Sequence, residues 1–455
     1  MSKPPFEKIL VANRGEIALR VIRACRELGI KTVAVYSQCD ATALHVRFAD
    51  ESVCIGPPQA SLSYLKVSNV ISAADITGAD AVHPGYGFLA ENAVFAEVVE
   101  SHGMTFIGPR PELLQTFGDK LSAKAAARKA GLPLIPGSTG SIADVEEAVA
   151  VAGEVGYPIM LKAAAGGGGK GMRVVEDAAQ LRRVFSLTSN EALAAFGNGD
   201  VFIERFLRSP RHIEVQVAGD MHGVAIHLAE RDCSMQRRHQ KVLEEAPAPN
   251  LSTELVERIR SSAVELVRAV GYHTVGTVEF LVDGDEFFFL EVNPRIQVEH
   301  PVTELVTGLD LIQMQIHLAA GAPMPITQDQ VVVRGHAIEA RINAEDPFTH
   351  VPSPGKVTGF FLPGGPGIRV DSAVHEQAMV QPYYDSMVAK LIVWAPTREK
   401  ALIKMRGALA ESVVEGIKTT IPLHKELLQH PDFVAGTMTT KTLDTYLAKR
   451  REDAK

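Results

Sequence analysis

The chain has 455 residues, of which 46% are hydrophobic and 22% charged, so it is long enough for two or three globular domains with their own cores. Its 46 basic and 54 acidic residues give a net charge of −8, which provides no general positive field for nucleic acid. No apolar run approaches the ~18 residues of a membrane span, no signal-peptide core follows the first methionine, and the scattered cysteines are typical of a reducing compartment. We therefore expect a cytoplasmic protein that binds neither nucleic acid nor membrane.

The N-terminal segment alternates between strand and helix. Short apolar strands are expected over residues 8–12 and 31–36. Between them, apolar residues recur with helical spacing at Ile17, Val21 and Ala24. A strand–helix–strand unit of this kind predicts a parallel sheet, and we interpret the segment as Rossmann-like. No G-x-G-x-x-G turn follows the first strand, so NAD is not an expected ligand.

The remaining chain predicts two further domains. A helix is expected over 119–129, and the middle third that follows carries most of the motifs. A Pro/Gly-rich segment at 352–367 and an amphipathic helical stretch at 398–412 come later. The predicted class is α/β and α+β, with domains at 1–117, 118–330 and 331–455.

Four consecutive glycines, 166–169, lie between strand-like segments at 157–162 and 172–175. This setting differs from a P-loop, in which a helix follows and Ser or Thr comes after the lysine. Each glycine costs about 0.5–1 kcal/mol in conformational entropy, so a run of four favours close approach of backbone N–H groups to phosphates. We predict a phosphate-binding flap with Lys162 and Lys170 as positive partners. A floppy surface hairpin is the alternative.

Acidic side chains lie in a hairpin predicted over residues 277–293. Glu279 and Glu291 each belong to an apolar strand, where a carboxylate is costly unless it is paired or metal-bound. Asn293 is two residues from Glu291 and therefore faces the same side. Mg²⁺ prefers one or two carboxylates, with phosphate and water oxygens completing its shell. The hairpin thus predicts a magnesium site, and an edge hairpin with solvated acids is the alternative.

The length of the hairpin loop bears on this site. A two-residue loop would place Glu279 opposite Phe288 and turn it away from Glu291. A three-residue loop at 283–285 would place Glu279 opposite Phe289, on the same face as Glu291. The metal hypothesis therefore requires an odd loop.

These residues and several polar motifs closely resemble the biotin carboxylases of the ATP-grasp superfamily. The resemblance covers essentially the whole chain, and two of its motifs are long and polar. Besides the glycine flap, the motifs are Asn13-Arg-Gly-Glu-Ile-Ala-Leu-Arg20, His83-Pro-Gly-Tyr-Gly-Phe-Leu89, Gly118-Asp-Lys120, Glu230-Arg-Asp-Cys-Ser-Met-Gln-Arg-Arg-His-Gln-Lys241, Glu291-Val-Asn-Pro-Arg-Ile-Gln-Val-Glu-His300 and Pro382-Tyr-Tyr-Asp-Ser-Met387. The implied fold is a Rossmann-like N-terminal (pre-ATP-grasp) domain, an ATP-grasp domain with a mobile glycine-rich lid at about 135–206, and a C-terminal biotin carboxylase domain.

The resemblance implies which residues bind the nucleotide and the metal. ATP would be contacted by Lys120, Lys162, Gly167, Gly168, Gly169, Met172, Glu204, Arg205, Leu207, His212, Gln236, His239 and Leu281. Mg²⁺ or Mn²⁺ would be held by Glu279, Glu291 and Asn293.

The resemblance also implies the chemistry. Bicarbonate would be bound by Lys241, Arg295, Gln297 and Val298. Glu299 would take a proton from bicarbonate while ATP phosphorylates it to carboxyphosphate. Breakdown to CO₂ and phosphate would follow, and Arg341 would stabilise the ureido oxygen of biotin as negative charge builds. Tyr86 would lie near the biotin pocket, and Glu299, Arg341, Arg295 and Lys241 would be the catalytic set.

Partners are implied in the same way. Biotin would arrive on a separate biotin carboxyl carrier protein, since the sequence has no Met-Lys-Met biotinylation motif, and carboxyltransferase subunits would use the product. A homodimer is expected, with Arg20 as a candidate interface residue, although a helix-surface arginine is the simpler interpretation. Acetyl-CoA carboxylase is the expected parent complex. However, Asn293-Pro294 resembles the multidomain carboxylases, so another acyl-CoA, pyruvate or urea stays open as final acceptor.

Two rival functions fit these residues less well. Another ATP-grasp ligase, such as a carbamoyl-phosphate or amino-acid ligase, would share the flap and the hairpin. It would not need Lys241, the segment 295–299 and Arg341 together. A catalytically silent nucleotide-binding subunit would be indicated by loss of Lys241, Glu299 or a magnesium carboxylate, and all of these are present. The sequence favours an active enzyme that makes carboxybiotin.

Overall fold

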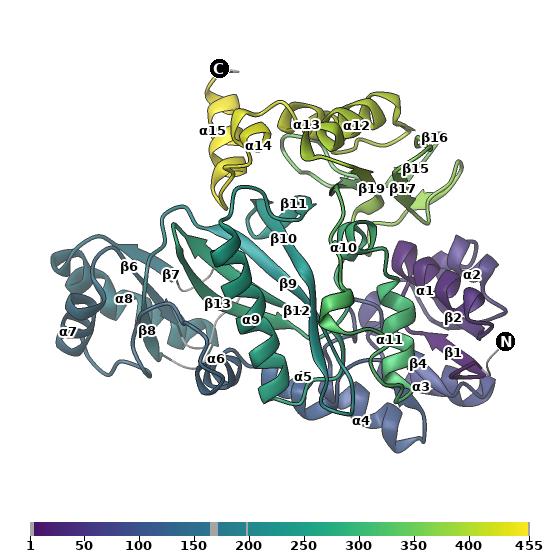
Figure 1. The fold of residues 1–455 in the computed structure, drawn as a ribbon, viewed down its shortest axis with the longest axis horizontal. Helices are drawn as coiled ribbons and strands as arrows, with labels where there is room; N and C mark the ends of the chain where they lie inside the picture. Colours follow the sequence, from purple (N-terminus) through teal and green to yellow (C-terminus); the bar gives the residue numbers. More distant parts are fainter. Residues whose placement is uncertain (1–3, 164–171, 197–198, 454–455) are drawn as a thin grey trace. The chain divides into compact units, whose positions relative to one another are not determined.

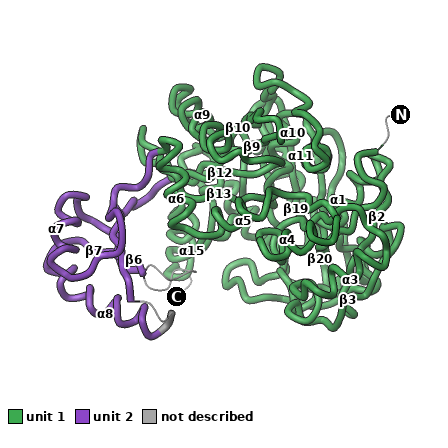
Figure 2. Tube along the Cα trace, turned by 90° about the horizontal axis from the view of Figure 1, so that it is seen from below, with its two compact units in different colours: residues 1–132, 211–455 green, residues 133–210 purple. Residues whose placement is uncertain are grey.

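A computed structural model describes residues 4–163, 172–196 and 199–453. The chain forms two compact units, one of Met1–Leu132 with Arg211–Lys455 and one of Pro133–Pro210, which are coloured separately in Figure 2. Among the helices of the described ranges, none combines the length and the apolar character needed to cross a membrane.

The larger unit begins with a five-stranded sheet in the order β3-β2-β1-β4-β5. Its strands are β1 Lys8–Val11, β2 Lys31–Ser37, β3 Glu51–Gly56, β4 Ala81–His83 and β5 Thr105–Phe106. Its helices are α1 Gly15–Glu27, α2 Leu44–Phe48, α3 Val67–Thr77, α4 Ala93–Ser101 and α5 Pro111–Gly118. Every neighbouring pair of strands is parallel, as the strand–helix–strand pattern predicts.

This sheet brings two sequence motifs to one edge. β1 and β4 are neighbours, and each is followed by a loop at its carboxyl end. The loop after β1 leads into α1 and Glu16, while the loop after β4 carries Tyr86. Carboxyl ends of adjacent parallel strands meet at the same edge of a sheet, so Glu16 and Tyr86 are brought together.

The centre of the larger unit is an eight-stranded sheet in the order β13-β12-β9-β10-β11-β14-β19-β17, with antiparallel neighbours throughout. Its strands are β9 Arg211–Gly219, β10 Ala225–Arg237, β11 Gln240–Ala246, β12 Thr274–Asp283, β13 Glu286–Asn293, β14 His336–Asn343, β17 Ile368–Asp371 and β19 Met387–Ala395. Long-range pairing of β11 with β14 makes one continuous sheet of segments from the middle and the C-terminal part of the chain.

Helices cover both faces of this sheet. Helix α9 (Thr253–Ala269) lies along β9 and β10 (Figure 1), and its Arg260 is bonded to Glu230. Helix α10 (His300–Thr307) packs on the opposite face, where its Thr303 accepts a hydrogen bond from Arg231. Because neighbouring residues of a strand face opposite sides, Glu230 belongs to the α9 face and Arg231 to the α10 face.

The remaining elements of the larger unit surround the two sheets. The helices are α6 Lys120–Lys129, α11 Leu311–Ala319, α12 Arg398–Glu411, α13 Ile421–Leu427, α14 Pro431–Ala435 and α15 Thr442–Asp453, with short 3-10 turns at Gln38–Asp40, Ala60–Leu62 and Gln328–Gln330. The short strands are β15 Gly355–Lys356, β16 Gly359–Phe361, β18 Met379–Val380 and β20 Val413–Glu415. The helices expected over 119–129 and 398–412 are thus confirmed as α6 and α12. The side chains of Asp119 and Thr397 cap these helices by accepting hydrogen bonds from backbone N–H groups of the first turn.

The smaller unit is a three-stranded antiparallel sheet, β7-β6-β8, with two helices. Its elements are β6 Ile159–Ala163, β7 Met172–Val175, β8 Val201–Arg205, α7 Val145–Val155 and α8 Ala178–Phe196. β6 and β7 pair with Lys162 opposite Met172, which confirms that a strand lies on each side of the glycine run. The glycines themselves lie outside the described residues.

Candidate active site

Four charged side chains lie side by side across four strands of the large sheet. The register pairs Glu279 on β12 with Glu291 on β13 on one side and with Glu214 on β9 on the other. Glu214 in turn lies opposite Arg231 on β10. Directly opposed residues share a face of the sheet. Glu291 is exposed, Glu279 is 3% exposed, and Glu214 and Arg231 are fully buried, so the row leads from solvent into the interior.

The hairpin loop differs from the odd loop that the metal hypothesis requires. β12 and β13 are joined by a two-residue turn at 284–285. This turn alone would pair Glu279 with Leu290 and separate it from Glu291. A bulge in the ladder next to Glu279 adds one residue on β13 and brings Glu291 opposite Glu279. The predicted loop length was wrong, whereas the shared face of Glu279 and Glu291 is confirmed.

Lys241 on β11 connects three carboxylates. Its Nζ lies 2.5 Å from Glu214, 2.8 Å from Glu279 and 2.6 Å from Glu299. Burial alone would lower the pKa of this lysine, but the three negative charges outweigh it and raise the pKa well above the ordinary value. Lys241 therefore stays protonated at the centre of the cluster.

Glu299 is held between two cations. It lies immediately before α10, is 2% exposed, and accepts from Lys241 at 2.6 Å and from Arg341 at 2.9 Å. Burial alone would raise its pKa, but Lys241, Arg341 and Arg231 together lower it below the ordinary value. Glu299 has the charge that a base needs, but it is a weak base while both cations bind it.

Arg231 is a buried member of this cluster that the sequence did not single out. Its guanidinium is fully buried, with Nε 2.5 Å from Glu214 and Nη2 2.8 Å from the side-chain oxygen of Gln297. Further bonds go to Gln216, Thr277 and Thr303. Arg231 belongs to the long polar motif at 230–241, but only its partners show that it orders the cluster.

Glu279 accepts three hydrogen bonds and lies close to a histidine nitrogen. Its Oε1 lies within 2.8 Å of donors on Lys241, Asn293 and Gln297, and its Oε2 lies 2.8 Å from Nε2 of His212. Burial would raise its pKa, but Lys241 and His212 hold it well below the ordinary value. Glu279 also raises the pKa of His212 against the effect of burial. The carboxylate is therefore ionised and well oriented.

The residues predicted to hold magnesium fit that ion. The Glu291 side chain is accessible, yet desolvation by the atoms around it and the negative charge of Glu279 raise its pKa. A cation between Glu279 and Glu291 would relieve this repulsion. Asn293 donates to Glu279, and its amide oxygen accepts from Arg295 while keeping a second lone pair. Two carboxylates and an amide oxygen suit Mg²⁺.

Ligand atoms of His212, Glu214 and Glu279 also lie within 4.8 Å of one another. This trio suits magnesium less well, because a histidine nitrogen replaces an oxygen ligand. In addition, Glu214 is already neutralised by Arg231 and Lys241. We therefore retain Glu291 and Asn293 beside Glu279 as the metal set.

The predicted bicarbonate residues are joined to the same cluster. Gln297 links Glu279 to Arg231, and Arg295 is linked to Glu279 through Asn293. Nε of Arg295 also lies 2.5 Å from Glu91, a partner that the sequence did not indicate. The bonded network thus runs without a break from Arg295 to Arg341.

Arg341 on β14 is oriented by two carboxylates. Its Nε lies 2.5 Å from Glu244 and its Nη2 lies 2.9 Å from Glu299. Glu244 is fully buried beside the equally buried Glu339, which lies opposite it in the β11–β14 register. Burial, only partly offset by Arg341, raises the pKa of Glu244 to about 7.

The predicted nucleotide residues fall into three groups. Lys162, Met172, Glu204, Arg205 and Leu207 belong to the smaller unit, where Lys162 and Glu204 form an ion pair. The larger unit carries Lys120 at the exposed start of α6, Leu281 opposite the buried His212, and Gln236 opposite Lys241. Gly167, Gly168 and Gly169 lie outside the described residues.

His239 occupies an unusual turn between β10 and β11. The turn is formed by Arg238 and His239, both with positive φ (46° and 68°) and neither a glycine. Such a conformation is costly for residues with a Cβ and is often kept for function. It presents His239 at an exposed position beside Gln236 and Lys241.

Arg20 differs from the expectation. It is 7% exposed and lies 2.8 Å from both Glu304 and Asp310 of the same chain. The interpretation as a helix-surface arginine was therefore wrong, because an intramolecular ion pair buries the side chain. An interface role gains no support from this position.

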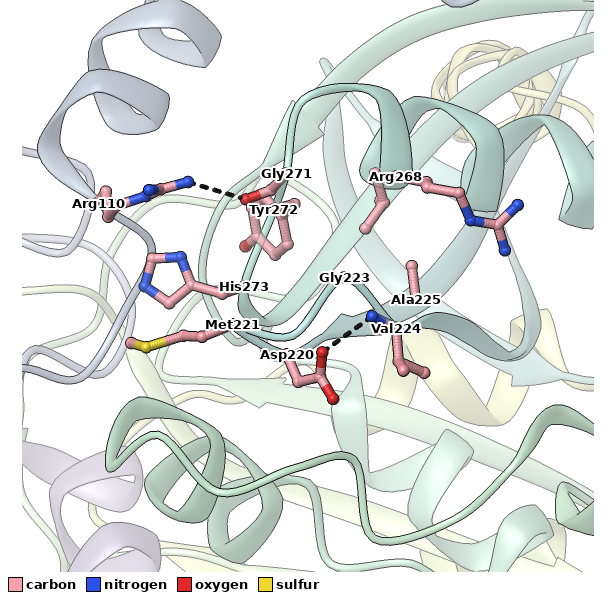
Figure 3. A pocket seen from close by; sticks show the side chains of 11 residues that line it. Arg110, Asp220, Met221, Gly223, Val224, Ala225, Arg268, Gly271, Tyr272 and His273 are labelled. Atoms are coloured by element: carbon pink, nitrogen blue, oxygen red, sulfur yellow. Dashed lines mark hydrogen bonds between the residues drawn. The ribbon is translucent and has the colours of Figure 1, made fainter.

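A cavity of about 240 Å³ lies outside the network (Figure 3). Among the predicted site residues that the structure describes, none lines it. Arg110 donates to the Gly271 backbone at 3.2 Å, and Asp220 accepts from the Val224 backbone at 2.9 Å. These polar groups serve the local fold, so the cavity is not part of the candidate active site.

Three parts of the chain match known families. Residues 5–114 match the family described as Biotin carboxylase, N-terminal domain. Residues 119–327 match Carbamoyl-phosphate synthase L chain, ATP binding domain, and residues 339–445 match Biotin carboxylase C-terminal domain. The expected three-domain fold is confirmed.

Individual relatives match over nearly the whole chain. The biotin carboxylase of Pseudomonas aeruginosa is 54% identical over 95% of this chain and 96% of its own. A pyruvate carboxylase subunit of Methanothermobacter thermautotrophicus is 51% identical over 97% of this chain and 90% of its own. The crystal structure of the Hydrogenobacter thermophilus 2-oxoglutarate carboxylase biotin carboxylase domain dimer, in complex with MgADP, ADP and bicarbonate, has a TM-score of 0.89 and 48% identity, covering 97% of this chain and 98% of that chain. The chain belongs to the biotin carboxylase family of ATP-grasp ligases, enzymes that carboxylate biotin in an ATP-dependent reaction.

Proposed function

We propose that the chain carboxylates biotin on a separate carrier protein, using bicarbonate and ATP, by way of carboxyphosphate. Bicarbonate is a poor electrophile, and phosphorylation turns it into an activated carrier of CO₂. The observation that supports this proposal best is the bonded chain from Glu279 through Lys241 and Glu299 to Arg341. It joins a metal carboxylate, an anion-binding cation, a base and a cation for biotin.

Bicarbonate would bind beside Lys241 and Arg295, which position the anion and stabilise its charge. In the free protein, the Lys241 ammonium forms an ion pair with Glu299 and thereby lowers the pKa of that carboxyl. An anion that competes for Lys241 weakens this effect, so bicarbonate itself makes Glu299 a stronger base. The base then takes the bicarbonate proton as the γ-phosphoryl group is transferred.

Biotin would bind at Arg341. Phosphate released from carboxyphosphate deprotonates the ureido nitrogen, and the guanidinium stabilises the negative charge on the ureido oxygen. Glu244 and Glu299 hold two edges of the guanidinium and so set its plane. Arg341 is thereby oriented before biotin arrives.

Glu279, Glu291 and Asn293 would hold Mg²⁺, which supplies positive charge to the phosphate oxygens of ATP when it is bound. The nucleotide would be contacted by the residues predicted for ATP, among them Lys162, His212 and Gln236. The H. thermophilus relative supports this assignment, because its complex contains MgADP and bicarbonate.

Phosphate release from ATP tests the proposal. Hydrolysis should require bicarbonate and should be stimulated by free biotin, though weakly, since the carrier supplies much of the natural substrate's binding energy. Activity that ignores bicarbonate, or that responds instead to an amino acid, would favour another ATP-grasp ligase.

For the assembly, we propose a homodimer that works with a biotin carboxyl carrier protein and carboxyltransferase subunits of an acetyl-CoA carboxylase. The whole-length resemblance to separate biotin carboxylase chains supports this choice. The relatives named for pyruvate and 2-oxoglutarate carboxylases make those acceptors the alternatives. Capture of the biotinylated partner, with identification of the transferase bound to it, distinguishes them.

A further inference from the structure

Lys390 of β19 is a fully buried lysine that the proposed reaction does not use. Its Nζ donates to the backbone oxygen of Val298 at 2.9 Å and lies 3.0 Å from Glu16. The β14–β19 register places Lys390 directly opposite Arg341, so the two side chains share a face. A buried ammonium is costly to desolvate, so its partners show what it orders.

The first partner leads to the biotin side of the site. Glu16 stands in the first turn of α1 and accepts a hydrogen bond from the hydroxyl of Tyr86. Both residues follow the carboxyl ends of neighbouring parallel strands. One carboxylate thus connects Lys390 to Tyr86, the side chain proposed to lie near biotin.

The second partner leads to the bicarbonate side. Val298 stands between Gln297 and Glu299 in the segment proposed to bind bicarbonate and supply the base. The peptide group is planar, so a bond to the Val298 oxygen also orients the amide of Glu299. The position of Lys390 therefore influences the backbone from which the Glu299 side chain projects.

We propose that Lys390 is a positioning residue that sets the separation between bicarbonate, at residues 297–299, and biotin, at Tyr86 and Arg341. The inference rests on the proposed function. CO₂ formed from carboxyphosphate is captured only if biotin lies within reach, and small misplacements of reacting groups cost large factors in rate. Loss of Lys390 therefore lets carboxyphosphate form and decompose without carboxylation.

The variant Lys390→Met keeps the bulk of the side chain and removes the ammonium. Phosphate release and fixation of ¹⁴C-bicarbonate on free biotin are measured in the same reactions. We expect the ratio of phosphate released to biotin carboxylated to rise about fivefold or more, with the KM for biotin increased. The KM for ATP should change by less than about twofold. A ratio equal to that of the unmodified chain overturns the proposal.

Arg398→Met is the matched control. Arg398 binds a fully buried carboxylate, Glu245, at 2.7 and 3.0 Å. Glu245 is next to Glu244 on β11 and so faces the opposite side of the sheet. Its ion pair contributes to stability but touches neither Val298 nor Tyr86. The control should keep the normal ratio even if it melts at a lower temperature.

Tyr86→Phe provides a second variant if Lys390→Met fails to fold. It removes only the hydroxyl bound to Glu16 and should raise the ratio by a smaller factor, and an unchanged ratio in a folded Tyr86→Phe contradicts the proposal. The two levels of inference fail differently. If the unmodified chain fixes no carbon on biotin, the proposed function is wrong. If the unmodified chain does carboxylate biotin and the variants keep its ratio of phosphate released to biotin carboxylated, only the proposed role of Lys390 is wrong.

Discussion

Lys241 and Glu299 form a buried ion pair at 2.6 Å, and Arg341 binds the other oxygen of the same carboxylate at 2.9 Å. The proposed base and the two cations proposed for its substrates thus neutralise one another in the free protein. Under the proposed function, each substrate would replace one of these contacts. The electrostatics of the site therefore change when substrates enter, and several measurable consequences follow from that exchange.

Replacement of Glu299 by glutamine should abolish the base while keeping the shape of the side chain. General-base loss costs about 10²–10⁴ in rate, or roughly 3–5 kcal/mol of barrier. We expect kcat for bicarbonate-dependent phosphate release to fall by that order, with ATP affinity altered less than about threefold. Near-normal turnover, or a defect confined to nucleotide affinity, would mean that the base lies elsewhere.

Replacement of Glu291 by glutamine should act on the metal instead. It removes the accessible carboxylate opposite Glu279 and leaves the Lys241–Glu299 pair in place. The Mg²⁺ concentration that gives half-maximal rate should rise about tenfold or more, as expected for loss of one carboxylate ligand. A titration of activity against Mg²⁺ at saturating bicarbonate measures this. An unchanged midpoint would remove Glu291 from the metal set.

Replacement of Arg231 by methionine tests the buried end of the charged row. Arg231 is bonded to Glu214 and Gln297 and is fully buried, so its loss leaves an incompletely compensated carboxylate in the interior. Breaking a buried pair in this way costs about 3–5 kcal/mol. The melting temperature should fall clearly. In contrast, Arg182→Met removes an exposed ion pair with Glu146 and should shift it little. Equal decreases in melting temperature for Arg231→Met and Arg182→Met would contradict the conclusion that the buried charged row stabilises the fold.

Local features of this fold could be predicted from sequence, because they depend on short stretches of chain. The parallel order of the first strands follows from strand–helix alternation, and the hairpin that carries Glu279 follows from two apolar runs around a turn. The row that joins Glu291 to Arg231 could not be predicted. It depends on pairing between distant strands. It also depends on a bulge that shifts the β12–β13 pairing by one residue from the register set by the turn.

The chemical roles followed from the resemblance more than from the pattern of residues. An arginine in a strand is usually exposed, so nothing in the sequence marked Arg231 as buried. The burial of Arg20 could not be predicted for the same reason, since its partners Glu304 and Asp310 are almost three hundred residues away. Buried ion pairs between distant segments become visible only in the folded chain.

Two neighbouring glutamates should respond to pH in opposite ways. The pKa of Glu244 is raised to about 7 by burial, so its contribution to stability is present below the unfolded pKa of about 4.3 and is lost as pH rises through 7. The pKa of Glu245 is lowered, because bonds from His336 and Arg398 outweigh burial. Its contribution is present above about 4.3 and is lost at lower pH.

Melting temperatures of Glu244→Gln and Glu245→Gln, measured against pH, test this opposition. The free energy of unfolding of Glu244→Gln, relative to that of the unmodified chain, should increase as the pH rises from 5 to 7, by at most about 1.4 kcal/mol per pH unit. The relative free energy of unfolding of Glu245→Gln should decrease as the pH rises from about 3 to 5 and should then stay constant. Parallel curves for the two variants would contradict the assigned protonation states.

Transfer of ¹⁴C from bicarbonate to biotin tests the central claim most directly. The purified chain is incubated with ATP, Mg²⁺, labelled bicarbonate and free biotin, and labelled carboxybiotin is quantified. We expect product only when all four are present, with a yield that falls by about 10²–10⁴ in Glu299→Gln. Phosphate release without any label on biotin, under conditions in which carboxybiotin is stable, would contradict the assignment of this site to biotin carboxylation.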